Sequence, residues 1–247
     1  MPSRDITILE YNQLLEFSSG QLVNIIRAAL QNQPRFTCAL AGGKSPEELY
    51  RALGRFKKEK FWNKVHVFST DERFVPASHD FNNFAMIRRN LLKSVPIPEK
   101  NCHPMPVASG SPDSAAHKYI EELKKFFNLK EGELPRFDLV LLGVGEDGHT
   151  ASLFPVLPKW MEKERFVISM KHPQIEYERL SLTLPVLNNS SHAVFFIHGA
   201  KKADVLYLKE QDSPRVWQFN ELAVAQLERV LAKVPADQEA SQLLAEA

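Results

Sequence analysis

Short apolar runs alternate with amphipathic stretches along most of the chain, and this alternation restricts the fold more than any other feature of the sequence. Residues 36–40 form a run typical of a buried strand, whereas Leu22, Ile25, Ile26 and Ala29 mark one face of a helix. Strands that alternate with helices need crossover connections, which place helices on both faces of a mostly parallel sheet. We therefore expect a three-layer α/β fold.

The same patterns predict the other elements of the fold. The expected strands are the short apolar runs 6–9, 36–40, 65–69, 137–142, 166–170, 180–184 and 193–197. Helices are expected after caps at Ser45, Asn83 (to about residue 93) and Ser111, and over residues 200–208 and 219–234. Cys102 lies among prolines, which favours a loop.

Length and charge limit the organisation of the chain and its partners. The 247 residues contain no internal repeat and no linker, so 1–247 are expected to form one domain, with 235–247 as a polar tail. The formal net charge is +1, which provides no overall field to attract nucleic acid or an anionic membrane. An anionic ligand must then be bound by a local site.

Neither the cysteines nor the histidines indicate a metal site. Cys38 and Cys102 form no disulfide framework and no zinc-ligand spacing, and the histidines other than His149 also lack ligand spacing. The N-terminus has no apolar segment of a signal peptide, and no run approaches the ~18 apolar residues that span a bilayer. We expect a cytoplasmic protein without metal or cofactor.

Ligands of parallel sheets bind beyond the carboxyl ends of the strands, and four loops of interest follow strands. Two of these loops combine glycine with lysine at the start of a helix, where free backbone amides attract anions. Their candidate anion-binding residues are Gly42, Gly43, Lys44 and Ser45 in the first loop and Lys201 in the second. Either loop could also be an ordinary helix start with solvated lysines.

The other two loops contain candidates for acid–base chemistry. Asp71 and Arg73 follow the strand 65–69, although an exposed turn with a local ion pair would look the same. Asp147 and His149 lie in the glycine-rich stretch 143–150. Histidine transfers protons near neutrality, and a neighbouring carboxylate can fix its tautomer. This stretch matches G-x-G-x-x-G, but prolines follow too soon for the long helix of a dinucleotide site.

Arg179 precedes the strand 180–184 and is a further candidate for binding a phosphate through two hydrogen bonds. It could equally pair with Glu176 or Glu178 at the surface. Taken together, the four loops and this arginine indicate a small anionic substrate, such as a phosphate ester, and acid–base chemistry without a metal.

The same stretches resemble the 6-phosphogluconolactonases along nearly the whole chain. Residues 147–155, Asp-Gly-His-Thr-Ala-Ser-Leu-Phe-Pro, match the most specific motif of that family in full. Residues 42–46 are similar to its Gly-Gly-Ser-Thr-Pro loop, with Lys44 and Ser45 as variants. Further matches are the Asp-Glu-Arg block at 71–76, the later blocks at 179–183 and 199–202, and a Trp-x-x-Asp ending at 217–220 in which asparagine replaces the aspartate.

This resemblance implies a Rossmann-like fold shared with sugar-phosphate isomerases and glucosamine-6-phosphate deaminases. It also implies hydrolysis of 6-phospho-D-glucono-1,5-lactone to 6-phospho-D-gluconate in the oxidative pentose phosphate pathway. By the same resemblance, the glycine loop, Arg179 and Lys201 hold the phosphate, His149 is the base that Asp147 orients, and Arg73 lies near the reacting end. Amides around residues 143–145 are expected to stabilise the oxyanion.

Two other interpretations stay open. The chain could be an aldose-phosphate isomerase or deaminase with Asp71 as the base that acts on carbon. Deaminases that resemble this chain carry a glutamate where Phe154 stands, which argues against that activity. A sugar-phosphate sensor without catalysis is the second alternative, and retention of both Asp147 and His149 argues against it.

Overall fold

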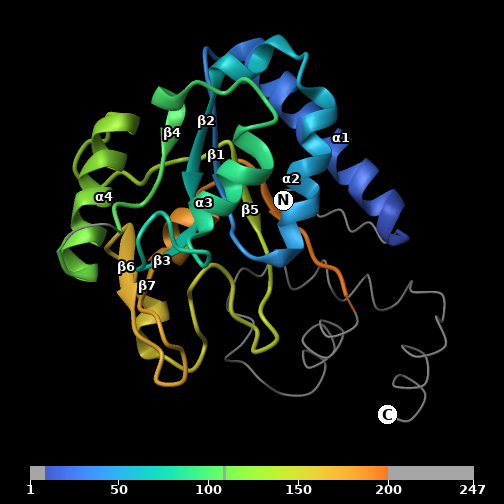
Figure 1. The fold of residues 1–247 in the computed structure, drawn as a ribbon. Helices are drawn as coiled ribbons and strands as arrows, with labels where there is room; N and C mark the ends of the chain where they lie inside the picture. Colours follow the sequence, from blue (N-terminus) through green and yellow to red (C-terminus); the bar gives the residue numbers. More distant parts are fainter. Residues whose placement is uncertain (1–8, 108–109, 200–247) are drawn as a thin grey trace, which may run out of the picture.

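A computed structural model describes residues 9–107 and 110–199, which are built around a five-stranded sheet (Figure 1). The strands lie in the order β4-β2-β1-β5-β8, and every neighbouring pair is parallel. Their bounds are β1 Phe36–Leu40, β2 Val65–Ser69, β4 Cys102–His103, β5 Leu139–Leu142 and β8 Ala193–Phe195. The predicted mostly parallel sheet is confirmed, and Cys102 lies in an edge strand rather than in a loop.

Helices cover both faces of this sheet, as the alternating pattern predicts. The α-helices are α1 Tyr11–Asn32, α2 Lys44–Leu53, α3 Asn83–Ile87, α4 Pro112–Phe127 and α5 Leu184–Asn188. Short 3-10 helices span Gly54–Phe56, Lys60–Lys64, Glu99–Asn101 and Pro158–Met161, and a π-helical turn, Arg88–Leu92, continues α3. Within residues 9–107 and 110–199, no helix combines the length and apolarity needed to cross a membrane.

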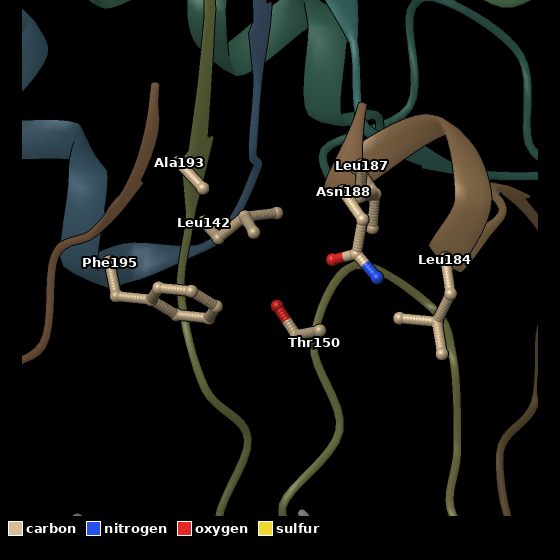
Figure 2. A pocket seen from close by; sticks show the side chains of 7 residues that line it. All are labelled: Leu142, Thr150, Leu184, Leu187, Asn188, Ala193 and Phe195. Atoms are coloured by element: carbon tan, nitrogen blue, oxygen red, sulfur yellow. The ribbon is translucent and has the colours of Figure 1, made fainter. Parts of the chain in front are cut away.

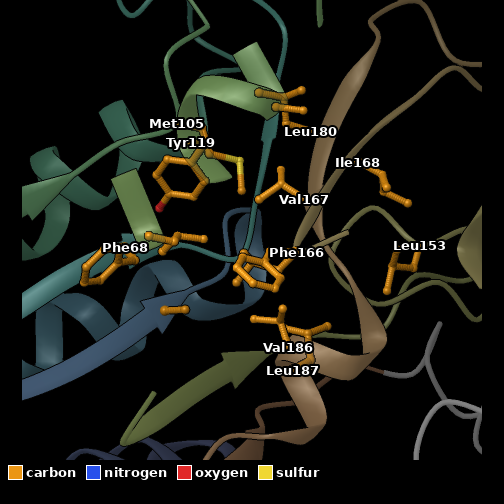
Figure 3. Packing of buried hydrophobic residues seen from close by; sticks show 14 of the residues in the cluster. Phe68, Met105, Tyr119, Leu153, Phe166, Val167, Ile168, Leu180, Val186 and Leu187 are labelled. Atoms are coloured by element: carbon orange, nitrogen blue, oxygen red, sulfur yellow. The ribbon is translucent and has the colours of Figure 1, made fainter. Parts of the chain in front are cut away.

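The sheet divides the apolar interior into two cores, because successive side chains of a strand point to opposite faces. Cys38 and Leu40 of β1 pack with α1, α2 and α3, whereas Ala39 between them packs in the core formed with α4. Figure 3 shows part of this second core, whose members include Tyr119 of α4 and Val167. With both faces covered by helices, a ligand can reach the sheet only at the ends of its strands, and in parallel sheets ligands bind beyond the carboxyl ends.

A second, antiparallel sheet of three strands contributes to the core formed with α4, in the order β3-β7-β6. Its strands are β3 Asp71–Arg73, β6 Val167–Met170 and β7 Arg179–Leu182. The prediction of a loop at residues 70–73 is therefore wrong. This polar segment is a strand because residues 179–181, far away in the sequence, supply its hydrogen-bonding partners. A local sequence pattern does not reveal such a partner.

The helix caps agree only partly with the prediction. Ser111 caps α4 through its side chain, as expected. Ser45 does not cap α2, because the helix begins at Lys44 and Gly43 is the cap residue, with a φ of 94°. Asn83 is already inside α3, and the side chain that caps this helix belongs to Asn82. In both wrong cases the helix begins earlier than its capping pattern indicates.

The strand ends also differ from the predicted ranges by one or two residues. Strands β5 and β6 begin after the predicted residues 137 and 166. Strand β7 ends before Thr183, which directly precedes α5, and β8 ends at Phe195. The predicted helices 200–208 and 219–234 lie outside the described residues. So does most of the predicted strand 6–9, and Leu9 itself is not in a strand.

Candidate active site

The segments that follow β1, β2 and β5 start at one edge of the parallel sheet, because neighbouring parallel strands end together. The backbone extends the pairing at this edge. The N–H of Ala41 donates to Leu141 O and the N–H of Thr70 donates to Leu40 O, both at 3.1 Å. Three of the four segments predicted as site loops therefore start here, although the one after β2 forms strand β3. Of the fourth, only Gly199 is described, and Lys201 lies outside the described residues.

Gly42 lies against the side chain of Asn83, and this contact joins the first loop to α3. A Cβ atom at position 42 would overlap the side-chain amide of Asn83, so no larger residue fits there without movement. Asn83 is 1% exposed, and its Nδ2 donates to the backbone oxygen of Asp71 at 3.0 Å. Its Oδ1 is buried without a hydrogen-bond partner among the described residues. One buried amide thus links the glycine loop to β3.

Lys44 and Ser45 occupy the first turn of α2, directly after the two glycines. Lys44 is exposed, and Ser45 is half-buried. Nε2 of His198 lies 3.3 Å from the backbone oxygen of Ser45, so the end of the described chain reaches this helix start. The structure therefore places these residues at the expected edge, with the lysine open to solvent.

Asp71 is 5% exposed, and both of its carboxylate oxygens accept hydrogen bonds. Ser152 Oγ donates to Oδ2 at 2.7 Å, and Thr70 Oγ1 donates to Oδ1 at 3.1 Å. Ser152 belongs to the segment that follows His149, so Asp71 ties β3 to the third loop. This bonding suits a carboxylate that holds the loop in place more than one that is free to act as a base.

Glu72 is fully buried and supports the backbone that starts α3. Its carboxylate accepts from the N–H groups of Arg73 (2.9 Å), Asn83 (2.6 Å) and Phe84 (2.8 Å). Burial raises the pKa of Glu72 to about 7, although these three donors act in the opposite direction. Glu72 therefore supports the start of α3 and is not a candidate for acid–base chemistry.

Arg73 and Arg179 face each other across the β3–β7 ladder. Nη1 of Arg73 donates to Phe81 O at 2.9 Å, whereas the Nε atoms of both arginines are buried without a partner among the described residues. Burial lowers the pKa of Arg179, and the positive charge of Arg73 lowers it further. Two half-buried guanidinium groups on neighbouring strands therefore form a positively charged surface suited to an anion. We call Arg73 and Arg179 the arginine ledge.

His149 and Asp147 form a hydrogen-bonded pair in the loop after β5, between Nδ1 and Oδ1. The loop is closed by the N–H of Gly145, which donates to His149 O at 2.7 Å, and Gly148 has a φ of 82°. A Cβ atom at Gly145 would overlap both side chains of the pair. The pKa of Asp147 falls to about 2: its burial acts against this shift and is outweighed by its bonds to His149.

The carboxylate of Asp147 lies close enough to Arg179 for its negative charge to act on that guanidinium group. The acidic groups that raise the pKa of Arg179 are Asp71, Glu72 and Asp147. Of the residues predicted for the site, the structure thus brings the β3 residues, Arg179 and the Asp147–His149 pair together at one edge. The glycine loop joins them through Asn83.

Two residues that matter for this geometry were not predicted as site residues. Ser152 holds Asp71, and Asn83, expected as a helix cap and as a residue of the family block after Asp71, connects Asp71 to Gly42. Both lie in or next to stretches that resemble the family, so the motifs contained a signal for them. Their role depends on contacts between distant segments, which the motifs alone do not describe.

A small cavity lies beneath the third loop, between β5, α5 and β8 (Figure 2). It is about 10 Å³ in volume and is lined by Leu142, Thr150, Leu184, Leu187, Asn188, Ala193 and Phe195. Thr150 Oγ1 donates to Gly143 O at 2.9 Å and helps to close the loop above it. This space is of the order of one water molecule, so it is too small for a sugar phosphate.

Comparison with known proteins agrees with the motifs. Residues 10–218 match the family described as glucosamine-6-phosphate isomerases/6-phosphogluconolactonase. A 6-phosphogluconolactonase of Synechocystis is 42% identical over 182 residues, covering 73% of this chain and 74% of the relative. One of Mycobacterium tuberculosis is 35% identical over 211 residues, covering 83% and 85%.

Solved structures show the same fold. The crystal structure of 6-phosphogluconolactonase from Thermotoga maritima superposes with a TM-score of 0.74 at 29% identity, covering 86% of this chain and 92% of that chain. The enzyme from Trypanosoma cruzi gives a TM-score of 0.73 at 28% identity, with coverages of 87% and 88%.

Proposed function

The chain belongs to the family of glucosamine-6-phosphate isomerases and 6-phosphogluconolactonases, and on this premise we propose that it hydrolyses 6-phospho-D-glucono-1,5-lactone to 6-phospho-D-gluconate in the oxidative pentose phosphate pathway. The observation that carries the proposal is the pairing of His149 with Asp147 beside two half-buried arginines. This arrangement supplies a base and an anion site for one small phosphorylated substrate.

His149 is the proposed base. The carboxylate of Asp147 can only accept, so Nδ1 of His149 carries the hydrogen and Nε2 keeps the lone pair that takes a proton from water. That water attacks the lactone carbonyl, and the protonated imidazole then returns a proton to the ring oxygen as the ring opens. A lactone is already an activated ester, so the reaction needs no covalent intermediate.

The substrate phosphate is proposed to bind at the glycine loop and at Arg179. The charges and donors assigned to it come from Gly42, Gly43, Lys44, Ser45, Arg179 and Lys201. Binding the phosphate far from the reacting carbon would position the carbonyl for attack by water. Arg73, on the strand next to Arg179, would then lie toward the reacting end.

The oxyanion needs hydrogen-bond donors near the lactone carbonyl, and one of the expected backbone N–H donors is already bonded within the loop. The N–H of Gly145 donates to His149 O, so this amide closes the loop instead. We therefore assign the stabilisation of the oxyanion to Arg73 and to the amides that precede Gly145.

Phe154 favours hydrolysis over deamination. Its ring is fully buried and lies 4.6 Å from the ring of His149, between centroids. A phenyl ring cannot relay a proton to the histidine, whereas a glutamate at this position could. The bonded carboxylate of Asp71 likewise disfavours its use as a base that acts on carbon.

We also propose that residues 1–247 act as one domain in the cytoplasm. Two cores that share a single sheet support the first point for the described residues. Both cysteines, Cys38 and Cys102, are free thiols, which suits a reducing compartment.

The test is a direct assay of proton release with freshly prepared 6-phosphoglucono-1,5-lactone, corrected for spontaneous hydrolysis. The wild-type protein should accelerate ring opening. His149→Ala should lower kcat by ~10²–10⁴ and leave KM nearly unchanged, as expected for loss of a general base. A melting curve of the variant would show that it is folded.

Each alternative has its own outcome. If the protein releases ammonia from glucosamine 6-phosphate at a comparable kcat/KM, its activity is that of a deaminase and the proposed lactonase activity is wrong. Tight binding of 6-phosphogluconate without turnover of any of these substrates would make the protein a sensor. A His149→Ala variant with normal kcat, when chemistry limits the rate, would remove the histidine from the mechanism.

A further inference from the structure

Three aromatic side chains gather beside the arginine ledge and have no part in the mechanism above. The ring of Tyr177 lies 5.4 Å from that of His79 and 5.8 Å from that of Phe81, between centroids, and the last two are 5.5 Å apart. Each ring thus contacts the other two. We call His79, Phe81 and Tyr177 the aromatic rim.

The rim is built from two loops that the antiparallel ladder brings together. His79 and Phe81 follow β3, and Tyr177 precedes β7. The N–H of Phe74 donates to Glu178 O at 2.8 Å and extends the pairing of β3 with β7 toward these rings. The rim therefore rests on the same two strands as Arg73 and Arg179.

Phe81 is 54% exposed, whereas the two other rings of the rim, His79 and Tyr177, are half-buried and carry polar atoms. A single exposed apolar side chain is common and needs no explanation by itself, but this one contacts two other rings and lies beside the two arginines. The backbone of Phe81 is also fixed, because its oxygen accepts from Nη1 of Arg73 at 2.9 Å. The guanidinium group of Arg73 thus lies next to the main chain that carries this apolar ring.

A phosphorylated sugar lactone presents two kinds of surface. Its phosphate and carbonyl oxygens need cations or N–H donors, whereas the C–H groups on a ring face are apolar. Small-molecule sites combine aromatic walls with a few placed polar groups for this reason. The ledge and the rim together offer both kinds of partner on adjacent parts of one surface.

We propose that the aromatic rim is the ring-contact surface of the site, with Phe81 packing against the C–H face of the substrate while the arginines hold its charged and polar groups. This inference rests on the proposed function and deepens it. Phe81 thereby determines specificity for a sugar ring over a bare anion, and the phosphate subsite alone would not make this distinction.

The test compares Phe81→Ala with Phe17→Ala. Phe17 is also an exposed phenylalanine, 40% exposed, but it lies on α1, on the opposite side of the molecule from β3 and β7 (Figure 1). Phe81→Ala should raise KM for the lactone roughly 3- to 10-fold, the size expected for an aromatic contact, with kcat nearly unchanged. Phe81→Tyr, which keeps the ring, should restore KM. Phe17→Ala should behave as wild type.

A binding measurement separates the rim from the arginines, because the bond from Arg73 goes to the backbone of Phe81 and survives the substitution. Calorimetry should show weaker binding of 6-phosphogluconate to Phe81→Ala, with unchanged binding of inorganic phosphate. Equal weakening for both ligands would overturn the inference, since the anion site itself would then have moved. So would a KM equal to that of Phe17→Ala.

The same binding data distinguish this inference from the proposed function. If the wild type does not hydrolyse the lactone, yet its binding of 6-phosphogluconate depends on the ring at position 81, the proposed reaction fails and the ring-contact surface stands. If hydrolysis is rapid and insensitive to position 81, the reaction stands and the ring-contact surface fails.

Discussion

Arg73 and Arg179 lie directly opposite each other on the antiparallel strands β3 and β7, and the Nε atom of each is buried without a partner among the described residues. Two like charges on adjacent strands repel each other, and burial adds a desolvation cost. Both effects appear in the lowered pKa of Arg179. An anion bound between or beside the two groups would offset these costs, so the ledge is best explained by a negatively charged ligand.

Arg179→Ala should therefore raise KM for the phosphorylated lactone far more than it changes kcat. A charge-assisted hydrogen bond contributes about 1.5–3 kcal/mol, which corresponds to roughly a 10- to 150-fold change in KM. Steady-state kinetics with the lactone measure this effect. Arg89→Ala, at an exposed position of the π-helical turn, is the matched control. KM for unphosphorylated glucono-1,5-lactone should not change in Arg179→Ala. An equal rise of KM for both lactones would show that Arg179 does not bind the phosphate.

Gly145→Ala should abolish most of the activity without unfolding the protein. The added Cβ would overlap Nδ1 of His149 and Oδ1 of Asp147, so the pair has to separate or move. Since catalysis depends on the placement of the histidine, kcat should fall by about 10²-fold or more. The readouts are kcat and the melting temperature.

Gly20→Ala is the control for this change, because a Cβ at that position of α1 meets nothing within 4 Å. It should keep full activity and gain stability, as expected for alanine in a helix interior. A Gly145→Ala variant as active as Gly20→Ala would show that the His149–Asp147 geometry tolerates displacement and is not needed for turnover.

The parallel sheet could be predicted from the sequence because its strands are continuous apolar runs. Phe36–Leu40 and Val65–Ser69 have the predicted bounds, and both are short segments whose burial is a local property. Asp71–Arg73 shows the opposite case. Its three charged residues form a strand only because residues 179–181 pair with them, and no local pattern contains that partner.

Prediction of the site was limited in the same way. Asp147 and His149 are two residues apart, and their pairing in the structure agrees with what their spacing suggested. The contact of Gly42 with Asn83 and the bond from Ser152 to Asp71 join segments that are distant in the sequence. Such contacts depend on the completed fold, so a motif can name the residues without giving their partners.

Glu72 should make the folded protein lose stability as pH rises toward neutrality. Burial raises its folded pKa to about 7 from an ordinary value of 4.5. Between these values the folded state keeps a proton that the unfolded state has released, so the free energy of unfolding falls with increasing pH. The total loss is on the order of 3 kcal/mol at most, from 1.36 kcal/mol per pKa unit.

Glu72→Gln tests this sign, because glutamine nearly keeps the shape and does not titrate. The variant should be less stable, since its NH₂ group faces a backbone N–H. The difference in unfolding free energy between wild type and variant should nevertheless shrink as pH rises from about 4.5 to 7. Urea denaturation at several pH values measures it, and a constant difference would show that Glu72 does not hold the extra proton.

His66, which lies near the amino ends of the parallel strands, should make the free energy of unfolding depend on pH with the opposite sign. Its Nδ1 lies 3.1 Å from Nε2 of His103, whose Nδ1 lies 2.9 Å from Glu122 Oε1. Burial lowers the pKa of His66 to about 4, with further lowering by His103, Arg35 and Lys100. Between about pH 4 and 6.5 the unfolded chain binds a proton that the folded chain does not, so stability rises with pH and is lost on acidification.

His66→Gln removes this titration and should flatten the acid side of the stability curve. The difference in unfolding free energy, wild type minus variant, should increase as pH rises from 4 to 6.5 and stay constant above that range. His66 is the second residue of β2, near its amino end, whereas the site lies beyond the carboxyl end of that strand. kcat/KM near neutral pH should therefore be unchanged. A difference that is constant from pH 4 to 6.5 would mean that His66 binds its proton equally well in the folded and unfolded chains.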